Sequence, residues 1–183
     1  MLDSISNIIL SKLMKLKEDE RQEYIEILSL LKPVPKLGRR EAKNIFEMQF
    51  AEVENMRRMI DTDNGAITAM EMFYDCSKES LMRYTVITFY HAFNYMLSQL
   101  EHIDNIERMN LNKKPKQEMI DDGIKELNRF GVLNTLDALA KDYGKSPLEV
   151  EQWSYGLVYS LMWKRRIESD IDDNRNERIK RKN

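Results

Sequence analysis

The feature of the sequence that most constrains the fold is a run of apolar residues with heptad spacing. Its members follow one another at alternating steps of four and three: Met82, Val86, Phe89, Phe93, Met96, Leu100 and Ile103. No Gly or Pro lies between Lys78 and Asn110, and Ser77 is a candidate N-cap. The pattern predicts one helix over about residues 78–109, longest or second-longest in the chain, at the centre of an all-α helical bundle.

The composition agrees with a helical protein that has a strongly charged surface. Hydrophobic residues make up 42% of the chain and charged residues 33%, whereas there are only six Gly and four Pro. The single Cys76 cannot form an intramolecular disulfide, so nothing points to an oxidising compartment. We expect neither a signal peptide nor a membrane span, because no run approaches the roughly 20 apolar residues that a span requires.

The sequence predicts four regions. Residues 1–32 form an N-terminal helical arm, and residues 33–39, with two prolines and a glycine, form a hinge. Residues 40–171 form the helical core, and residues 172–183 form a charged tail, which extends the last helix or is disordered. No internal repeat is apparent.

Shorter helices are expected on either side of the central one. Apolar spacing predicts helices over residues 39–60, 66–74 and 117–130. Asn134 with Asp137 resembles a capping box for a helix that ends at Gly144. Ser146-Pro-Leu-Glu149 is a clearer helix start, because Ser caps, Pro suits the first helical position and Glu reaches back.

No group of residues indicates catalysis or metal binding. His91 and His102 share a helix face but lie about 16 Å apart along the predicted helix, too far for one metal. The acidic clusters Asp121-Asp122 and Asp170, Asp172 and Asp173 lack the alternating ligands of an EF-hand. Cys76 has no Cys-x-x-Cys partner, and no glycines form a phosphate loop. We therefore predict no catalytic residue, no cofactor, no metal and no enzyme activity.

Nucleic-acid binding has weak support in the sequence. Residues 136–153 could form two helices joined by a tight turn at Gly144, as in a helix-turn-helix. The second helix would present Glu149 and Glu151 to the phosphates, and the basic residues of the tail are interleaved with acidic ones. With a net charge of −2, the chain is not expected to bind nucleic acid.

Four aromatic residues near the C-terminus are the candidate protein-binding site. They are Trp153, Tyr155, Tyr159 and Trp163, of which the last three are spaced one helical turn apart. An exposed stripe would be a surface for binding another protein, whereas a buried stripe would dock the last helix on the central helix. The sequence leaves both interpretations open. Arg175 and Arg178, in the charged extension, complete the candidate set.

Residues 123–166 resemble the C-terminal region of small helical morphogenesis proteins of tailed phages, of the tail assembly chaperone type. The similar segments are G-I-x-E-L-x-R-F-G at residues 123–131, L-N-T-L-D-A-L-A at residues 133–140, and an E-V…Y-x-x-V block at Glu149, Val150, Tyr155 and Val158. The chain departs from the pattern at Trp153-Ser154, where related sequences often have Leu-Pro. The match covers about a quarter of the chain.

The resemblance implies a non-enzymatic protein that assists tail assembly through protein contacts. Its partners would be other phage structural or tail proteins, such as a tape-measure-like coiled coil, and a homo-oligomer is also open. A structural head, neck or tail component of the mature virion is the alternative. A helical nucleic-acid-binding regulator is a further alternative. The expected location is the host cytoplasm, or the virion if the protein is a structural component.

Overall fold

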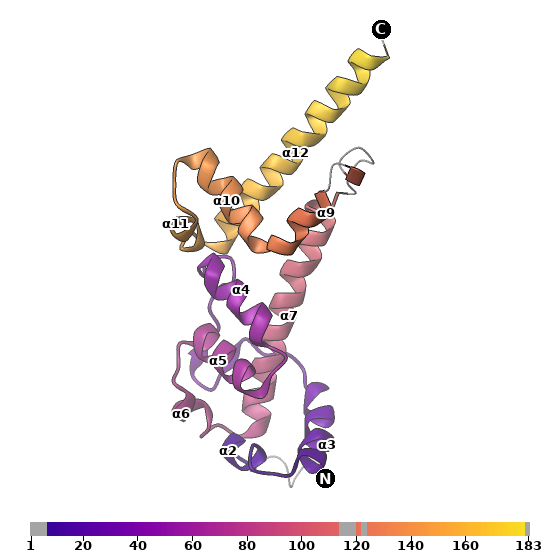
Figure 1. Cartoon of the computed structure of the whole chain (residues 1–183). Helices are drawn as coiled ribbons and strands as arrows, with labels where there is room; N and C mark the ends of the chain where they lie inside the picture. The colour runs from indigo at the N-terminus through magenta and orange to yellow at the C-terminus, as the bar shows by residue number, and fades with distance from the viewer. Residues whose placement is uncertain (1–6, 114–119, 122–123, 182–183) are drawn as a thin grey trace. The chain divides into compact units, whose positions relative to one another are not determined.

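The computed structural model describes residues 7–113, 120–121 and 124–181, and these residues are mostly helical (Figure 1). The chain forms two compact units. Unit 1 comprises Met1–Ile45 and Glu52–Ile103, and unit 2 comprises Phe46–Ala51 and Asp104–Asn183. The predicted all-α class is confirmed, with one very small hairpin as the exception. The boundary between the units falls inside the predicted core of residues 40–171.

The described helices and strands follow one another along the chain. Those with most of their residues in unit 1 are α2 (Leu10–Leu13), α3 (Glu18–Ser29), β1 (Lys36–Leu37), β2 (Arg40–Glu41), α4 (Phe50–Met59), α5 (Asp63–Tyr74), α6 (Lys78–Leu81) and α7 (Val86–Asn110). Those of unit 2 are α9 (Ile124–Leu127), a 3₁₀ turn (Asn128–Phe130), α10 (Val132–Tyr143), α11 (Pro147–Glu151) and α12 (Tyr155–Lys180).

The predicted central helix exists, but it begins eight residues later than expected. Helix α7 begins at Val86, where the Thr85 hydroxyl accepts a hydrogen bond from the Thr88 amide. Ser77 instead caps the separate short helix α6. The interruption arises because the backbone around Thr85 pairs with the N-terminal segment: the Leu10 amide donates to Tyr84 O and the Val86 amide to Ile8 O. Five of the seven seam residues are buried, whereas Met82 and Phe93 are half-buried.

The predicted helix over residues 39–60 is wrong in its first half. Residues 36–41 form the hairpin of β1 and β2, and helix α4 begins only at Phe50. Leu37 of this hairpin is fully buried, the Ala42 amide donates to Pro35 O, and the Lys43 amide donates to Phe73 O. These long-range contacts hold the segment in a non-helical path.

The remaining boundary predictions have mixed outcomes. Gly144 ends α10 in a left-handed conformation, and Ser146 and Glu149 form the expected capping box. The predicted cap at Asn134 is wrong, because α10 begins at Val132 and the Asn134 side chain donates to Leu127 O instead. Of the predicted helix over 117–130, residues 117–119 and 122–123 lie outside the described residues, and Ile124–Leu127 is helical.

The N-terminal arm packs within unit 1. Leu10, Leu13 and Leu28 are buried, and Asn94 of α7 donates to the carbonyls at the end of α3. The predicted hinge is also attached to α7, since the Val34 amide donates to His91 O and His91 Nδ1 lies 2.6 Å from Lys32 O. The arm and the Pro-rich segment therefore cover one face of the central helix.

Each unit contains a copy of the same motif, which the sequence did not reveal. Helices α5 and α10 each have twelve residues and begin and end 69 positions apart. Each ends at a left-handed residue, Asp75 or Gly144, and each is followed by a short helix capped by a serine, Ser77 or Ser146. A long helix follows, beginning at Val86 in one copy and, again 69 positions later, at Tyr155 in the other.

The two copies also receive an extended segment in the same way. In unit 1 the pair Tyr84-Thr85 binds residues 8–10, as described above. In unit 2 the Phe50 amide donates to Trp153 O and the Tyr155 amide donates to Met48 O. Buried positions coincide in the two copies, in the pairs Ile67/Leu136, Met70/Leu139, Leu81/Val150, Val86/Tyr155, Phe89/Val158 and Tyr90/Tyr159. Over residues 63–103 and 132–172, only Ala69/Ala138, Tyr74/Tyr143, Ser77/Ser146 and Tyr90/Tyr159 are identical, because the motif requires apolar positions and caps rather than particular residues.

Candidate protein-binding surface

Tyr155, the first residue of α12, lies in the core of unit 2. Its side chain is fully buried, its ring is stacked on that of Phe50 at a centroid distance of 6.2 Å, and Phe46 approaches to 5.9 Å. The Tyr155 hydroxyl donates to Glu107 Oε1 over 2.6 Å. The Tyr155 ring is packed inside unit 2, and its hydroxyl has a hydrogen-bond partner there. A partner protein therefore cannot contact Tyr155 without displacing the side chains that surround it.

Tyr159, one turn later, is also part of this core. Its ring stacks on Tyr155 at 6.4 Å, and Asn110 Nδ2 donates to its hydroxyl over 2.6 Å. Two of the four predicted aromatic residues therefore dock α12 on the C-terminal end of α7 within unit 2. For these two residues, the structure favours packing over direct binding.

The two tryptophans are more accessible. Trp153 is half-buried and packs edge-to-face against Tyr143, with ring centroids 5.7 Å apart. Trp163 is 42% exposed, and its ring centroid lies 6.1 Å from that of Tyr159. The structure thus divides the aromatic stripe: it begins in the core and ends at the surface with Trp163.

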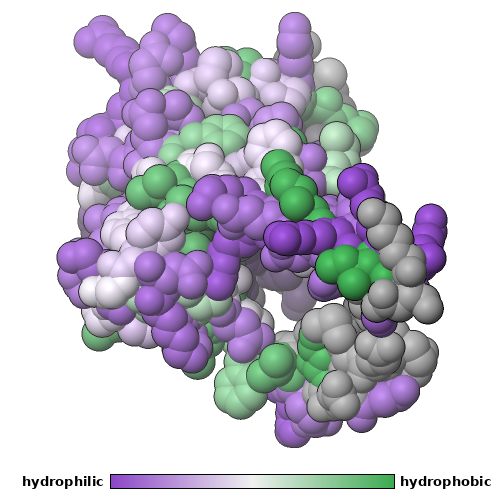
Figure 2. Space-filling model, turned by 90° about the horizontal axis from the view of Figure 1, so that it is seen from above, coloured by the Kyte–Doolittle hydropathy of each residue, from purple (hydrophilic) through white to green (hydrophobic). Residues whose placement is uncertain are grey.

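Trp163 begins an apolar stripe that the sequence did not single out. Ile167 and Ile171 follow at one-turn spacing on the same face of α12, and both are exposed. Figure 2 shows hydrophobic side chains interrupting the hydrophilic surface in several places. Among the described residues, all large exposed apolar side chains except Leu30 and Met109 fall between residues 127 and 179: Leu127, Phe130, Val132, Leu133, Tyr143, Leu148, Leu157, Trp163, Ile167, Ile171 and Ile179.

Arg175 and Arg178 lie beyond this stripe on the last turns of α12. Both are exposed, and with Ile171, Asn174 and Ile179 they line a surface hollow. The expected charged C-terminal helix is present, since α12 continues as a helix to Lys180. The six predicted residues therefore share one segment, but only Trp163, Arg175 and Arg178 are open to a partner, with Trp153 partly so.

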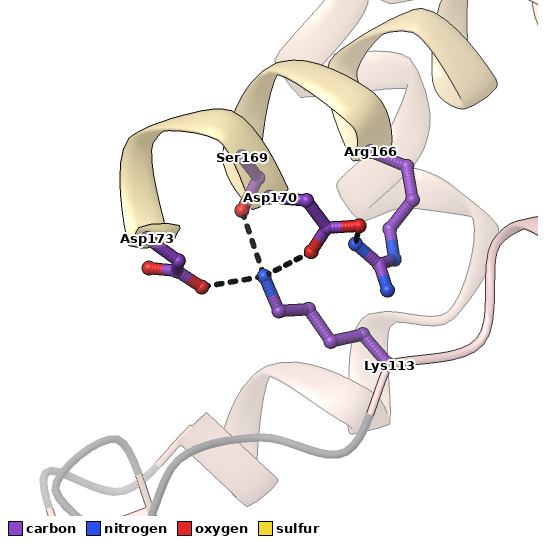
Figure 3. A network of polar contacts seen from close by, with 5 residues as sticks. All are labelled: Lys113, Arg166, Ser169, Asp170 and Asp173. Atoms are coloured by element: carbon purple, nitrogen blue, oxygen red, sulfur yellow. Dashed lines mark hydrogen bonds and ion pairs between the residues drawn. The ribbon is translucent and has the colours of Figure 1, made fainter. Parts of the chain in front are cut away.

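A network of charges attaches the middle of α12 to Lys113 (Figure 3). The Lys113 ammonium lies 2.6 Å from Asp173 Oδ2 and 2.9 Å from Asp170 Oδ1, and it donates to the Ser169 hydroxyl over 3.2 Å. The hydrogen bonds to Asp173 and Asp170 raise the pKa of Lys113, and Arg166 together with Lys113 lowers the pKa of Asp170. Asp170 and Asp173, two members of the predicted acidic cluster, thus form ion pairs with Lys113 of the same chain.

The other residues considered for chemistry have ordinary surroundings. Within the described ranges, no three His, Cys, Asp or Glu side chains are grouped closely enough to hold a metal. Cys76 is half-buried, and burial raises the pKa of its thiol, which disfavours the reactive thiolate. Of the two histidines, His91 approaches the Lys32 carbonyl and His102 is exposed.

The helix-turn-helix-like segment has a very short second helix. Helix α11 has five residues, and Glu149 is bound to Ser146 in the capping box and to Lys145 in an ion pair of 3.2 Å. Hydrogen bonding from the Ser146 backbone is the main cause of the lowered pKa of Glu149. This carboxylate therefore stays ionised, which is unfavourable next to a phosphate backbone.

Comparison of the sequence with protein-family models and curated proteins, and of the structure with solved structures, finds no match. Within the part of the chain that the structure describes, none of the helices combines the length and the apolar character needed to cross a membrane.

Proposed function

We propose that this protein is a non-enzymatic phage morphogenesis protein that assists tail assembly through protein–protein contacts made by unit 2. The observation that carries the proposal is the exposed apolar stripe Trp163, Ile167 and Ile171 on α12. Aromatic side chains beside charged ones are the usual composition of a binding surface, and Arg175 and Arg178 lie next to this stripe. The segment that resembles tail assembly proteins, residues 123–166, contains Trp163.

A second set of exposed apolar residues supports the same proposal. Leu127, Phe130 and Leu133, around the junction of α9 and α10, are at least half exposed. Scattered single exposed leucines are common in proteins, but clusters of large apolar side chains mark interaction sites. Helices that present such faces bind other helices or grooves, which fits helical partners among tail proteins.

The proposal is tested by deleting the gene in the phage that encodes it. We expect infected cells to accumulate filled heads without tails in electron micrographs, and the wild-type gene supplied in trans to restore tails. Trp163→Ala should fail to restore them, whereas the control Leu148→Ala, on α11, should succeed. Normal tails after deletion would refute the proposal.

Mass spectrometry of purified virions distinguishes an assembly factor from a component of the particle. We expect the protein to be absent from purified particles but present in infected-cell lysates. Its presence at a fixed stoichiometry in the particle would favour the structural head, neck or tail component instead.

A further inference from the structure

The two copies of the repeated motif differ in what covers one face of their long helix, which is α7 in unit 1 and α12 in unit 2. The face in question is the one that carries Asn94 in unit 1. In unit 1 this face includes Asn94, which is buried. In unit 2 the residue 69 positions later is Trp163, which is 42% exposed.

The cover in unit 1 is the end of helix α3 together with the extended residues after it. Asn94 Nδ2 lies 3.2 Å from Leu28 O, 3.2 Å from Ser29 O and 2.8 Å from Leu31 O. Leu28 and Ser29 are the last two residues of α3 and Leu31 follows it, so these carbonyls lie beyond the regular hydrogen bonds of the helix, although Leu28 O also accepts from the Leu31 amide. The following residues continue along α7, where the Val34 amide donates to His91 O.

Among its described residues unit 2 has no counterpart of α3, for a reason visible in the connectivity. In unit 1 the extended segment at residues 8–10 continues into α2 and α3, and α3 returns to the face around Asn94. In unit 2 the equivalent segment is residues 48–50, and from Glu52 onward the chain belongs to unit 1. The residues after this segment, which correspond to the arm by their position in the chain, are thus part of unit 1.

We propose that the face of unit 2 around Trp163 binds the C-terminal end of an amphipathic helix of a partner protein, together with the extended residues that follow it. This inference deepens the proposed function and rests on it, because it names the kind of partner segment and the way in which it is held. In unit 1 the equivalent face is covered by the end of α3 and the extended residues after it, which shows the kind of segment that the motif accommodates.

The residue at the centre of the face has the chemistry that this occupant requires. The indole Nε1–H of Trp163 is a hydrogen-bond donor with no acceptor capacity, so it can replace the Asn94 amide as donor to free helix carbonyls. The Trp163 ring lies beside the Tyr159 ring, and 42% of the residue remains exposed. Ile167, one turn later, adds an apolar contact for the helix.

The test uses a segment already known to fit the equivalent face. The probe is a fluorescein-labelled synthetic peptide with the sequence of residues 18–37, which contains α3 and the Pro-rich segment, titrated with the 183-residue protein and followed by anisotropy. We expect saturable binding that Trp163→Ala weakens by about tenfold or more. Trp163→Phe, which keeps a ring but removes the donor, should weaken binding about threefold. Leu148→Ala is the matched control and should change binding less than about twofold.

Two results would overturn the inference. One is the absence of saturable binding up to about 1 mM peptide, the weak end of measurable affinity. The other is binding that Trp163→Ala leaves unchanged, which would show that the peptide has replaced the arm in unit 1. Binding equal to wild type in Trp163→Phe would refute the role of the indole N–H. These results are independent of the phage experiment: if the peptide binds through Trp163 but the deletion leaves tails normal, the proposed function fails and the helix-binding face remains.

Discussion

Asn94 and Trp163 occupy equivalent positions in the two copies of the motif, 69 residues apart, yet Asn94 is 9% exposed and Trp163 is 42% exposed. This difference in exposure follows from the segments that contact each residue. The Asn94 amide donates to carbonyls at and just beyond the end of α3, whereas Trp163, beside the Tyr159 ring, remains 42% exposed. Equivalent positions therefore have different roles: one holds the chain together, and the other is available to a partner.

The first prediction concerns Asn94. Asn94→Ala should lower the free energy of unfolding by about 2–4 kcal/mol, because it removes a buried donor to carbonyls at and just beyond the end of α3. Chemical denaturation followed by circular dichroism measures this loss. Glu101→Ala, at an exposed position on the same helix, is the control and should change stability by less than about 0.5 kcal/mol. A similar small effect for both variants would show that the arm is not held by Asn94.

The second prediction tests whether the arm belongs to the folded core. Leu28 is 1% exposed, and Leu30, only two residues later, is 84% exposed. Leu28→Ala should destabilise by about 2–5 kcal/mol because it leaves a cavity against α7, and Leu30→Ala should have almost no effect. Equal and small effects in thermal and urea denaturation would instead support an independent arm attached through a hinge at residues 33–39.

The third prediction separates packing from binding in the aromatic stripe. Tyr159→Ala should cost about 3–5 kcal/mol, because a buried ring and its bond from Asn110 are lost. Trp163→Ala should cost clearly less than Tyr159→Ala, because 42% of Trp163 is exposed, while reducing partner binding by about 2 kcal/mol or more. Stability is measured by denaturation, and binding is measured by titration with the purified partner. A large loss of stability in Trp163→Ala would contradict a surface role.

The fourth prediction concerns the pH dependence of the capping box. The pKa of Glu149 in the folded protein is lowered from its usual 4.5, mainly by hydrogen bonding from the Ser146 backbone. A lowered pKa means that ionised Glu149 contributes stability above the unfolded value, and that this contribution is lost as the pH falls through the folded value. Glu149→Gln should therefore be less stable than wild type at pH 7, and the difference should shrink below about pH 4.5.

Urea denaturation of wild type and Glu149→Gln over a range of pH values measures this dependence. Gln keeps the reach of the side chain and removes only the charge, so it is a matched replacement. Glu151→Gln, also on α11, is the control. If the difference between wild type and Glu149→Gln does not change with pH, the charge of Glu149 plays no part in the cap.

Local features of the fold could be predicted from the sequence because their causes lie within a few residues. The capping box of Ser146 and Glu149, the left-handed stop at Gly144 and the apolar seam of α7 depend on neighbouring side chains and on helical periodicity. The continuation of α12 to Lys180 is also local, since ion pairs at i,i+4 spacing, such as Lys164 with Glu168, support an exposed helix.

Features that depend on distant partners could not be predicted. The interruption before α7 and the non-helical path of residues 36–49 are caused by backbone hydrogen bonds to Ile8, Leu10, Phe73 and Tyr155, which lie far away in the chain. The repeated motif was missed because its two copies share burial and capping rather than residue identity.

The sequence by itself determined that the chain is helical and where several helices begin and end. Tertiary structure alone decided that Tyr155 and Tyr159 are buried, because contacts with Phe50, Glu107 and Asn110 from distant segments enclose them. It also decided that Trp163, two turns after Tyr155, is 42% exposed, because the segments that enclose Tyr155 and Tyr159 do not enclose it to the same degree. Helical periodicity places all three aromatic residues near one another on α12, but only long-range packing separates core from surface.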